Sequence, residues 1–238
     1  MNKICRLSAI TLLASSTSLM AQSKSFEGAS LGVSFSAVGV ELAGNSTSGS
    51  NTNANTNPDR TSGTLGKVAE IASLDLAYTF ATGANGAISV GASYTPGKAK
   101  AGTGTYTDAA SSGSNIIAGQ TSGSTGSISV EVKDPYTIYI APTYVVSKDA
   151  AMYVKVGYSK ADVNVANSGS GALTQKPNDL EGWTYGIGSK IMLTPNAYVG
   201  VEASITDYDS ISATRATSQK ITVDPKVVQA SLAIGYKF

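Results

Sequence analysis

Apolar and polar residues alternate along most of the chain. The segment Val227–Phe238 shows the pattern clearly, because every second residue from Val228 to Phe238 is apolar, while the residues between them are mostly small or polar. A period of two indicates a β-strand whose faces meet different surroundings. The apolar face is made of Val228, Ala230, Leu232, Ile234, Tyr236 and Phe238. The opposite face, with Gln229, Ser231 and Lys237, is expected to meet a polar environment.

Eight segments of this kind follow one another, and two types of connection alternate between them. Short turns rich in Gly, Asn or Asp lie at 82–86, 147–150 and 194–197, and long stretches rich in Gly, Ser, Thr and Asn lie at Asn45–Gly66, Pro96–Ser127, 167–179 and 213–219. Such connections join antiparallel neighbours. The pattern predicts an all-β fold, an eight-stranded antiparallel up-and-down β-barrel with short turns at one end and long loops at the other. The predicted strands are Glu27–Leu42, Lys67–Ala81, Ala87–Thr95, Ile128–Val146, Met152–Val165, Leu180–Leu193, Tyr198–Ser212 and Lys220–Phe238.

Composition indicates whether the apolar side chains of such a barrel point outward to lipid or inward to a core. Charged residues make up only 14% of the chain, whereas about a quarter is usual for soluble domains. After the N-terminus there is no apolar run long enough for a transmembrane helix. Low charge without long apolar runs is typical of a transmembrane barrel, whose apolar residues face lipid and alternate with residues facing the lumen. A soluble barrel would instead place its apolar residues inside.

Aromatic residues gather near both ends of the predicted strands, as expected for the two interfaces of a membrane. One group lies near the short turns and the other near the long loops. The first is Tyr78, Phe80, Tyr144, Tyr236 and Phe238, and the second is Tyr94, Tyr136, Tyr158, Trp183 and Tyr208. Two prolines, Pro135 and Pro142, interrupt the fourth segment, and because proline cannot donate to the ladder we expect each at a bulge or near a strand end.

The N-terminus carries a targeting pattern. Lys3 and Arg6 precede the apolar stretch Leu7–Met20, and Ala21 is a suitable residue before a cleavage site. This pattern predicts a signal peptide over residues 1–21 and a barrel domain over residues 22–238. Basic and acidic residues nearly balance, 17 against 16, so nothing indicates nucleic acid as a partner.

The absence of histidine limits the chemistry available to the chain. A Ser-His-Asp triad and a histidine-containing zinc site are both excluded. No motif indicates a Ser-Lys dyad, and the glycines near Gly186 lie inside a predicted strand rather than in a phosphate-binding loop. We therefore predict no catalytic residues, no cofactor and no metal site.

The best cluster of functional groups is a set of charges predicted to face the lumen. Lys155, Lys190 and Glu202 lie on three consecutive predicted strands at similar distances from a short turn, and Asp75 faces inward from the second strand. Isolated charges in a narrow lumen would be costly, so we expect them to pair. A barrel of eight strands has an interior about wide enough for side chains. The cluster is interpreted as a structural plug, and the alternative is a gate for small solutes.

Several stretches resemble a known family. The run G-W-T-Y-G-I-G-S-K-I-M-L-T-P-N-A-Y-V-G-V-E-A-S-I-T-D-Y-D at Gly182–Asp209 is similar to the penultimate hairpin of small outer-membrane β-barrels of the OmpA-like, OmpX-like and opacity-protein type. The runs Tyr139–Tyr144 and Gly157–Asp162 fit the same type, as does the ending A-I-G-Y-K-F. The resemblance implies the outer membrane of a Gram-negative bacterium. It also implies that Leu232, Ile234, Tyr236 and Phe238 form a signal read by the barrel assembly machinery.

The resemblance specifies the fold better than the function. Outer-membrane barrel enzymes of the phospholipase, deacylase and omptin types use a catalytic histidine, so an enzyme is not expected. The favoured function is a structural or adhesin-like surface role carried by the long loops, where binding residues often lie. The alternative is a narrow OmpW-like pore for small or apolar solutes. The expected partners are outer-membrane lipid and lipopolysaccharide, the assembly machinery, and host-cell or matrix ligands of the loops.

Overall fold

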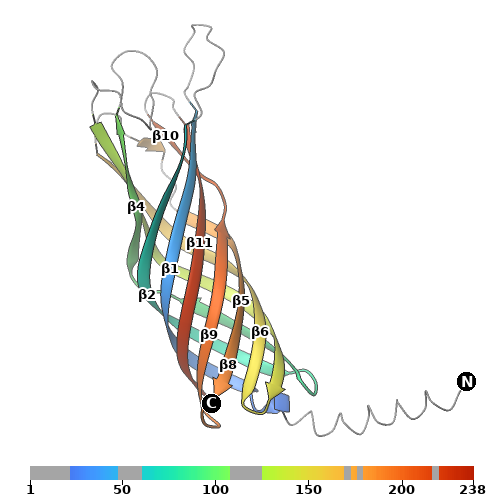
Figure 1. The fold of residues 1–238 in the computed structure, drawn as a ribbon. Helices are drawn as coiled ribbons and strands as arrows, with labels where there is room; N and C mark the ends of the chain where they lie inside the picture. The colour runs from blue at the N-terminus through green and yellow to red at the C-terminus, as the bar shows by residue number, and fades with distance from the viewer. Residues whose placement is uncertain (1–21, 48–60, 108–124, 169–172, 176–178, 216–219) are drawn as a thin grey trace, which may run out of the picture.

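The computed structural model describes residues 22–47, 61–107, 125–168, 173–175, 179–215 and 220–238. These residues form a closed antiparallel β-barrel (Figure 1). Each wall strand pairs with its neighbours in the chain, and the first strand pairs with the last to close the wall. The predicted eight-stranded up-and-down barrel is therefore confirmed. Its wall strands are β1 Gly28–Thr47, β2 Thr61–Ala81, β3 Gly86–Tyr94, β5 Thr125–Ser147, β6 Ala150–Ser168, β8 Asp179–Met192, β9 Ala197–Tyr208 and β11 Lys220–Lys237.

Three further strands lie beyond the predicted wall, in regions where the sequence indicated loops. Strand β4 (Lys98–Thr107) follows β3 after a short break and pairs with β5. Strand β10 (Ile211–Arg215) follows β9 and pairs with β11 and with the short β7 (Leu173–Gln175). The wall strands β1, β2 and β5 are also longer than predicted at this end. Above the membrane both faces of a strand meet water, so the apolar alternation that revealed the lower strands disappears there.

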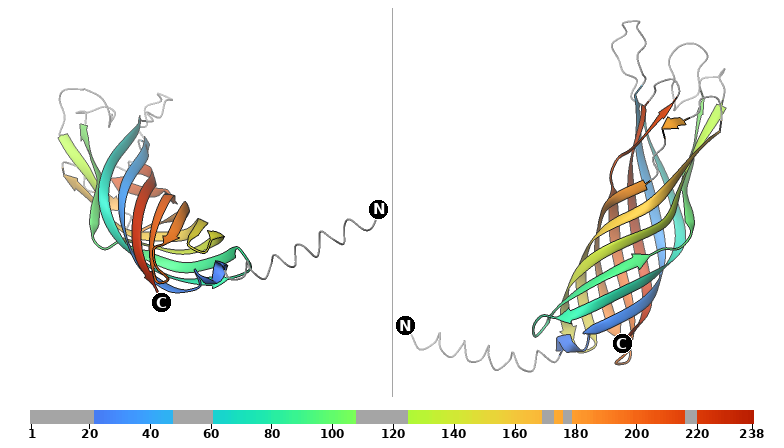
Figure 2. Two further views of the ribbon diagram at one scale, coloured as in Figure 1. Left: turned by 60° about the horizontal axis from the view of Figure 1, so that its bottom comes forward. Right: turned by 180° about the vertical axis from the view of Figure 1, so that it is seen from behind.

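Both described chain ends lie at the short-turn end of the barrel (Figures 1 and 2). Residues 22–24 are helical, and the chain then enters β1 at Gly28. The C-terminal β11 ends beside it, where the Phe238 N–H donates to the carbonyl of Ala29 at 2.9 Å. Among the described residues, no helix is long and apolar enough to cross a membrane.

Large apolar side chains cover the outside of the barrel and small polar ones fill the inside. Leu76, Ile187 and Leu232 are 60%, 64% and 55% exposed. In contrast, the inward residues Ser73 and Thr184 are each 5% exposed. This inverted arrangement is that of a barrel surrounded by lipid and is incompatible with a soluble barrel.

Two rows of aromatic residues border the apolar surface. Tyr158 and Trp183 meet edge to face on the loop side, with ring centroids 5.7 Å apart. Tyr236 and Phe238 make a similar contact on the turn side at 5.1 Å. At about 3.4 Å per residue, the stretch of β5 from Tyr136 to Tyr144 measures about 27 Å before strand tilt, comparable with the apolar band of about 25 Å expected for outer-membrane barrels.

Tyr208 departs from the predicted aromatic row. It has the same inward parity as Glu202 and Thr206, and it packs inside the barrel against a cluster formed by Ala161, Val163 and Leu180. The sequence interpretation placed it outside because of its position near a loop. The alternation of β9 overrides that position.

The two prolines of β5 occupy different settings. Pro135 lies in an irregularity of the β5–β6 ladder, where the register shifts between Lys133 and Tyr136. Pro142 pairs with Ile88 near the short-turn end of β5. Both positions agree with the expectation that proline lies at a bulge or near a strand end.

Candidate functional site in the barrel lumen

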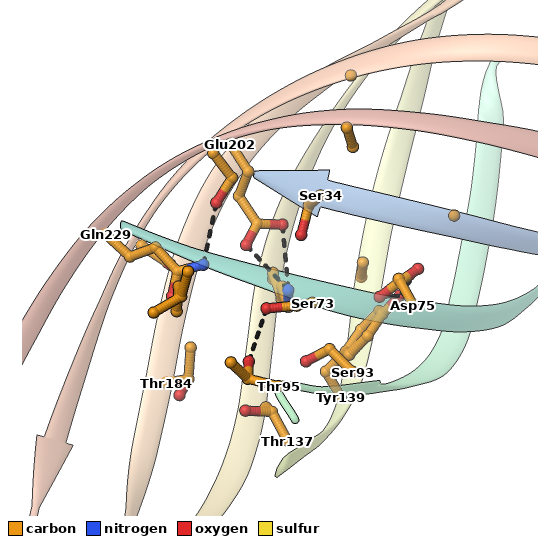
Figure 3. Close-up of a pocket in the computed structure, with 18 of the residues that line it drawn as sticks. Ser34, Ser73, Asp75, Ser93, Thr95, Thr137, Tyr139, Thr184, Glu202 and Gln229 are labelled. Atoms are coloured by element: carbon orange, nitrogen blue, oxygen red, sulfur yellow. Dashed lines mark hydrogen bonds and ion pairs between the residues drawn. The ribbon is translucent and has the colours of Figure 1, made fainter. Parts of the chain in front are cut away.

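The lumen contains a cavity of about 450 Å³ (Figure 3). Small-molecule sites in proteins usually enclose about 300–1,000 Å³, so the cavity is large enough to hold a ligand. Its walls differ in chemistry from the short-turn end to the loop end. We describe them as an apolar floor, a charged layer, a hydroxyl belt and an apolar upper wall.

The apolar floor lies at the short-turn end of the lumen. It is made by Phe26, Val145, Ala151, Met192 and Tyr198, which are all buried. The N-terminal residues are held in place by hydrogen bonds from the hydroxyl of Ser23 to the carbonyl of Gly83 and from the hydroxyl of Ser25 to the carbonyl of Lys148. The residues that precede β1 thus contribute Phe26 to the floor.

The charged layer lies next to the floor and contains the four charges predicted from the sequence. Lys155 Nζ lies 2.9 Å from Glu202 Oε1, and Tyr153 donates a hydrogen bond to Glu202 Oε2, also at 2.9 Å. Lys155 stands on β6 and Glu202 on β9, with β8 between them. On β8, Gly186 pairs with Lys155 and Gly188 pairs with Glu202. Because neither glycine has a side chain, the side chains of Lys155 and Glu202 can meet across β8.

Asp75 and Lys190 take different partners from those expected. The Tyr139 hydroxyl lies 2.8 and 3.0 Å from the two carboxylate oxygens of Asp75. Lys190 Nζ lies 4.6 Å from the centre of the Tyr198 ring. Among the described residues, neither Asp75 nor Lys190 takes part in an ion pair. The expectation that all four charges pair is therefore met only by Lys155 and Glu202.

Three inward tyrosines contact the groups of the charged layer and were missed by sequence reasoning: Tyr139 and Tyr153 within the layer, and Tyr198 in the floor below it. Tyr139 and Tyr153 bind the two carboxylates, and the rings of Tyr139 and Tyr198 each face an ammonium group. Their inward position follows from the strand parity that placed Lys155 inward. Their roles depend on which strands lie across the lumen, which parity alone does not give.

The hydroxyl belt lies above the charged layer and consists of Ser36, Ser73, Thr95, Thr137, Ser159, Thr184, Thr206 and Ser231. Neighbouring members bond across adjacent strands, as in Ser73–Thr95 at 2.6 Å and Thr184–Thr206 at 2.7 Å. Gln229 donates to Ser36 at 2.8 Å. Figure 3 shows several of these groups surrounding an open centre. The belt offers a ligand many neutral hydrogen-bonding groups and no charge.

The described lumen contains no arrangement typical of a catalytic or metal site. No group of three or more Asp, Glu, His or Cys side chains among the described residues could hold a metal ion. Of the described lumen lysines, Lys155 donates to Glu202 and Lys237 donates to a backbone carbonyl. Neither donates a hydrogen bond to a serine hydroxyl, as a Ser-Lys dyad would require. The described groups can bind a ligand by hydrogen bonds and apolar contacts.

The family of the chain follows from a comparison with known domains. Residues 9–238 match the model of the outer membrane protein beta-barrel domain. The chain belongs to this family. Its place is accordingly the outer membrane of a Gram-negative bacterium. Because the short turns of such barrels face the periplasm, the opposite ends of β1, β2 and β5 lie on the extracellular side. A comparison with curated protein sequences found no match.

Solved outer-membrane barrels have a similar fold at low sequence identity. The outer membrane protein OprG from Pseudomonas aeruginosa is 14% identical, with 89% of this chain and 96% of that chain covered and a TM-score of 0.54. The attachment invasion locus protein Ail of Yersinia pestis, solved with the heparin analogue sucrose octasulfate, is 13% identical over 89% and 99% of the two chains, with a TM-score of 0.43. The outer membrane protease OmpT of Escherichia coli is 11% identical over 90% and 97%, with a TM-score of 0.47. At 14% identity, the comparison with OprG shows a similar fold and says nothing about function.

The other predicted site residues lie on the outside or beyond the described chain. Leu232, Ile234, Tyr236 and Phe238 all face outward and are 50–71% exposed, and their role in assembly stays a prediction. The predicted loops Asn45–Gly66 and Pro96–Ser127 are partly strand, and their central residues 48–60 and 108–124 lie outside the described residues. The predicted signal peptide, residues 1–21, also lies outside them.

Proposed function

We propose that this barrel serves as a non-enzymatic interaction protein of the cell surface, with its binding residues on the extracellular loops. The observation that carries the proposal is the height of the wall. Strands β1, β2 and β5 contain 20, 21 and 23 residues, whereas about 9–11 residues suffice to cross the membrane. Residues Thr125–Lys133 of β5 lie above the aromatic row and add about 27 Å of strand at about 3.4 Å per residue.

The positions of charged residues on the outer surface support the conclusion that the upper part of the wall lies outside the membrane. Described ion pairs on the extracellular side join Lys98 to Glu131, Lys160 to Glu181 and Lys226 to Asp207. Between the two aromatic rows, the described outward side chains are uncharged. A wall that continues into water as a hydrogen-bonded sheet would hold the loops away from the lipid surface, where a partner could reach them.

A deletion in the loop between β1 and β2 tests the proposal. Removing residues 50–59 should reduce adhesion of bacteria to cultured host cells and to immobilised extracellular matrix at least fivefold, while the barrel keeps its heat-modifiable migration in gels. A matched control replaces the short turn residues Pro195 and Asn196 by Gly, at the opposite end of the barrel. Unchanged adhesion after the loop deletion, at equal surface expression, would contradict an adhesive role for this loop.

A second function, a narrow pore, is favoured by the lumen cavity. Against a pore, the apolar floor and the Lys155–Glu202 pair fill the short-turn end of that cavity. This filling supports a barrel that does not conduct ions. Planar bilayer recordings separate the two functions. Discrete conductance events from the wild-type barrel that change on substitution of Glu202 would favour the pore.

A further inference from the structure

The barrel wall has a gap in its hydrogen bonding. The ladder between β2 and β3 ends at the pair Leu74–Tyr94. Beyond this pair β4 takes the place of β3, and β4 pairs with β5 but not with β2 in the described part of the chain. Figure 1 shows β4 diverging from β2 toward the extracellular end. Two strand edges therefore face each other without a ladder between them.

The residues between β3 and β4 build this gap into the fold. Pro96 has no N–H to donate, and Gly97 and Asp134 adopt positive φ angles of 105° and 47°. The N–H of Gly97 donates to Asp134 Oδ1 and the N–H of Asp134 donates to the carbonyl of Gly97, both at 2.8 Å. These bonds fix the start of β4 to β5 at a bulge. The bulge redirects the strand away from β2.

The gap is continuous with the lumen cavity. The cavity is lined by residues Ala69–Ser73 from the β2 side of the gap and by Thr95–Lys98 from the other side. The hydrogen bond between Ser73 and Thr95 marks its lower limit. Tyr94, 43% exposed, belongs to the extracellular aromatic row, so the gap opens where the outer leaflet meets water.

The cavity wall inside the gap is mostly apolar, while Glu70 and Lys98 line the cavity at the two sides of the gap itself. The apolar residues of this wall include Val38, Val40, Ala69, Ile71, Val132 and Val227. Below this upper wall lies the hydroxyl belt, and below the belt lies the charged layer. The formal charges of that layer sum to zero, since Asp75 and Glu202 balance Lys155 and Lys190. A ligand thus passes one carboxylate and one ammonium group at the gap. Inside the gap it meets apolar surface, then neutral hydrogen-bonding groups, and then a charged layer without net charge.

We infer that the cavity binds one small amphiphile, an alkyl chain with an uncharged hydroxyl-bearing head, which enters sideways from the outer leaflet between β2 and β4. The head reaches the hydroxyl belt, where Ser73 and Thr95 are the nearest groups to the gap. The alkyl chain lies against Ile71 and the other residues of the upper wall. A charged head would lose its hydration in the hydroxyl belt without meeting an opposite charge there, so neutral heads are preferred. This binding site is separate from the proposed loop-borne function.

Methyl NMR of the mature barrel in phosphatidylcholine nanodiscs tests the site with 1-decanol as the probe. Ile71 lines the cavity, whereas Ile88 faces lipid and is 40% exposed. The Ile71 methyl signal should shift and saturate as decanol is added, while the Ile88 signal should follow only the unsaturable partitioning of decanol into the bilayer. Resonances are assigned with the variants Ile71→Val and Ile88→Val. An Ile71 signal that does not shift, or that tracks Ile88, would overturn the inference.

Adjacent residues of β2 provide a matched pair for the entrance. Ala69 lines the cavity, and Val68 beside it faces outward at 71% exposure. Ala69→Trp should weaken decanol binding at least fivefold, whereas Val68→Trp should leave it within twofold. If Ala69→Trp does not fold, Ala69→Leu takes its place with a smaller loss. Equal affinities in the inward and outward variants would contradict entrance through the gap.

Two further comparisons test the head group and the independence of the site. Decanoate and decyltrimethylammonium should bind at least fivefold more weakly than decanol, and equal binding of either ion would overturn the preference for a neutral head. The barrel lacking residues 50–59 should bind decanol as the wild type does, even if its adhesion is lost. Loss of decanol binding in this variant would contradict a site confined to the lumen.

Discussion

Lys155 and Glu202 form an ion pair of 2.9 Å across an intervening strand. Their side chains are only 10% and 14% exposed, and Tyr153 adds a hydrogen bond to the same carboxylate. Removing one member of a buried pair leaves the other charge uncompensated, which usually costs about 3–5 kcal/mol. We expect Glu202→Ala to lower the free energy of unfolding by an amount in this range, measured by urea titration of the barrel in lipid vesicles.

Two variants separate the loss of the pair from other effects of the substitution. The double variant Lys155→Met/Glu202→Leu removes both charges and should recover most of the stability, because no charge remains buried. Asp207→Ala removes one partner of the exposed Lys226–Asp207 pair, whose side chains are 44% and 64% exposed, and should leave stability unchanged. A single variant no less stable than the double variant would contradict a structural role for the pair.

Gly188 leaves room for the Tyr153 ring. A Cβ placed on Gly188 would overlap the ring and hydroxyl of Tyr153, whereas a Cβ on Gly39 would meet its nearest neighbour, the Val228 carbonyl, at an ordinary 3.9 Å. Gly188→Ala should therefore lower the free energy of unfolding by about 1–3 kcal/mol, the usual cost of overpacking. Gly39→Ala is the control, and a loss of equal size in both variants would show that the close contact is not the cause. Urea titration measures both.

The alternation of the sequence was sufficient to predict the fold because lipid and lumen impose opposite demands on the two faces of each strand. The same parity placed Lys155, Lys190, Glu202 and Asp75 inside the barrel. Parity states only the direction of a side chain. The partners of Asp75 and Lys190 depend on strand register and on the reach of tyrosines across the lumen, and so they emerged only from the structure.

The extracellular wall and the gap beside it could not be predicted in the same way. The β4 segment K-A-K-A-G-T-G-T-Y-T is mostly polar or small at both odd and even positions, and it therefore resembles a loop. Pro96 and Gly97 indicate a break in the strand. They do not indicate that the strand beyond the break keeps its ladder with β5 and loses the one with β2.

Phe238 is expected to contribute to assembly more than to the stability of the finished barrel. It is 71% exposed and contacts Tyr236 on the outer surface at the short-turn end, so its removal uncovers no core. Deletion of Phe238 should reduce the heat-modifiable, membrane-inserted fraction in cells several-fold, while purified protein refolded into vesicles keeps a similar urea midpoint. Phe238→Tyr, which keeps an aromatic ring at the terminus, should insert normally. Normal insertion of the deletion variant would contradict the assembly signal.

The apolar floor should keep the barrel from conducting ions. Phe26 and Tyr198 are 5% and 3% exposed and pack together with Val145, Ala151 and Met192 across the short-turn end. We expect no discrete conductance events from the wild-type barrel in planar bilayers. The double variant Phe26→Ala/Tyr198→Ala removes both aromatic rings of the floor and should show measurable ion conductance. The matched control is Tyr236→Ala/Phe238→Ala, which removes two aromatic rings of the outer surface at the same end and should stay silent. Wild-type conductance would contradict a sealed lumen. A silent floor variant that is fully inserted would instead assign the seal to the charged layer, in which case adding Lys155→Ala and Glu202→Ala should open the barrel.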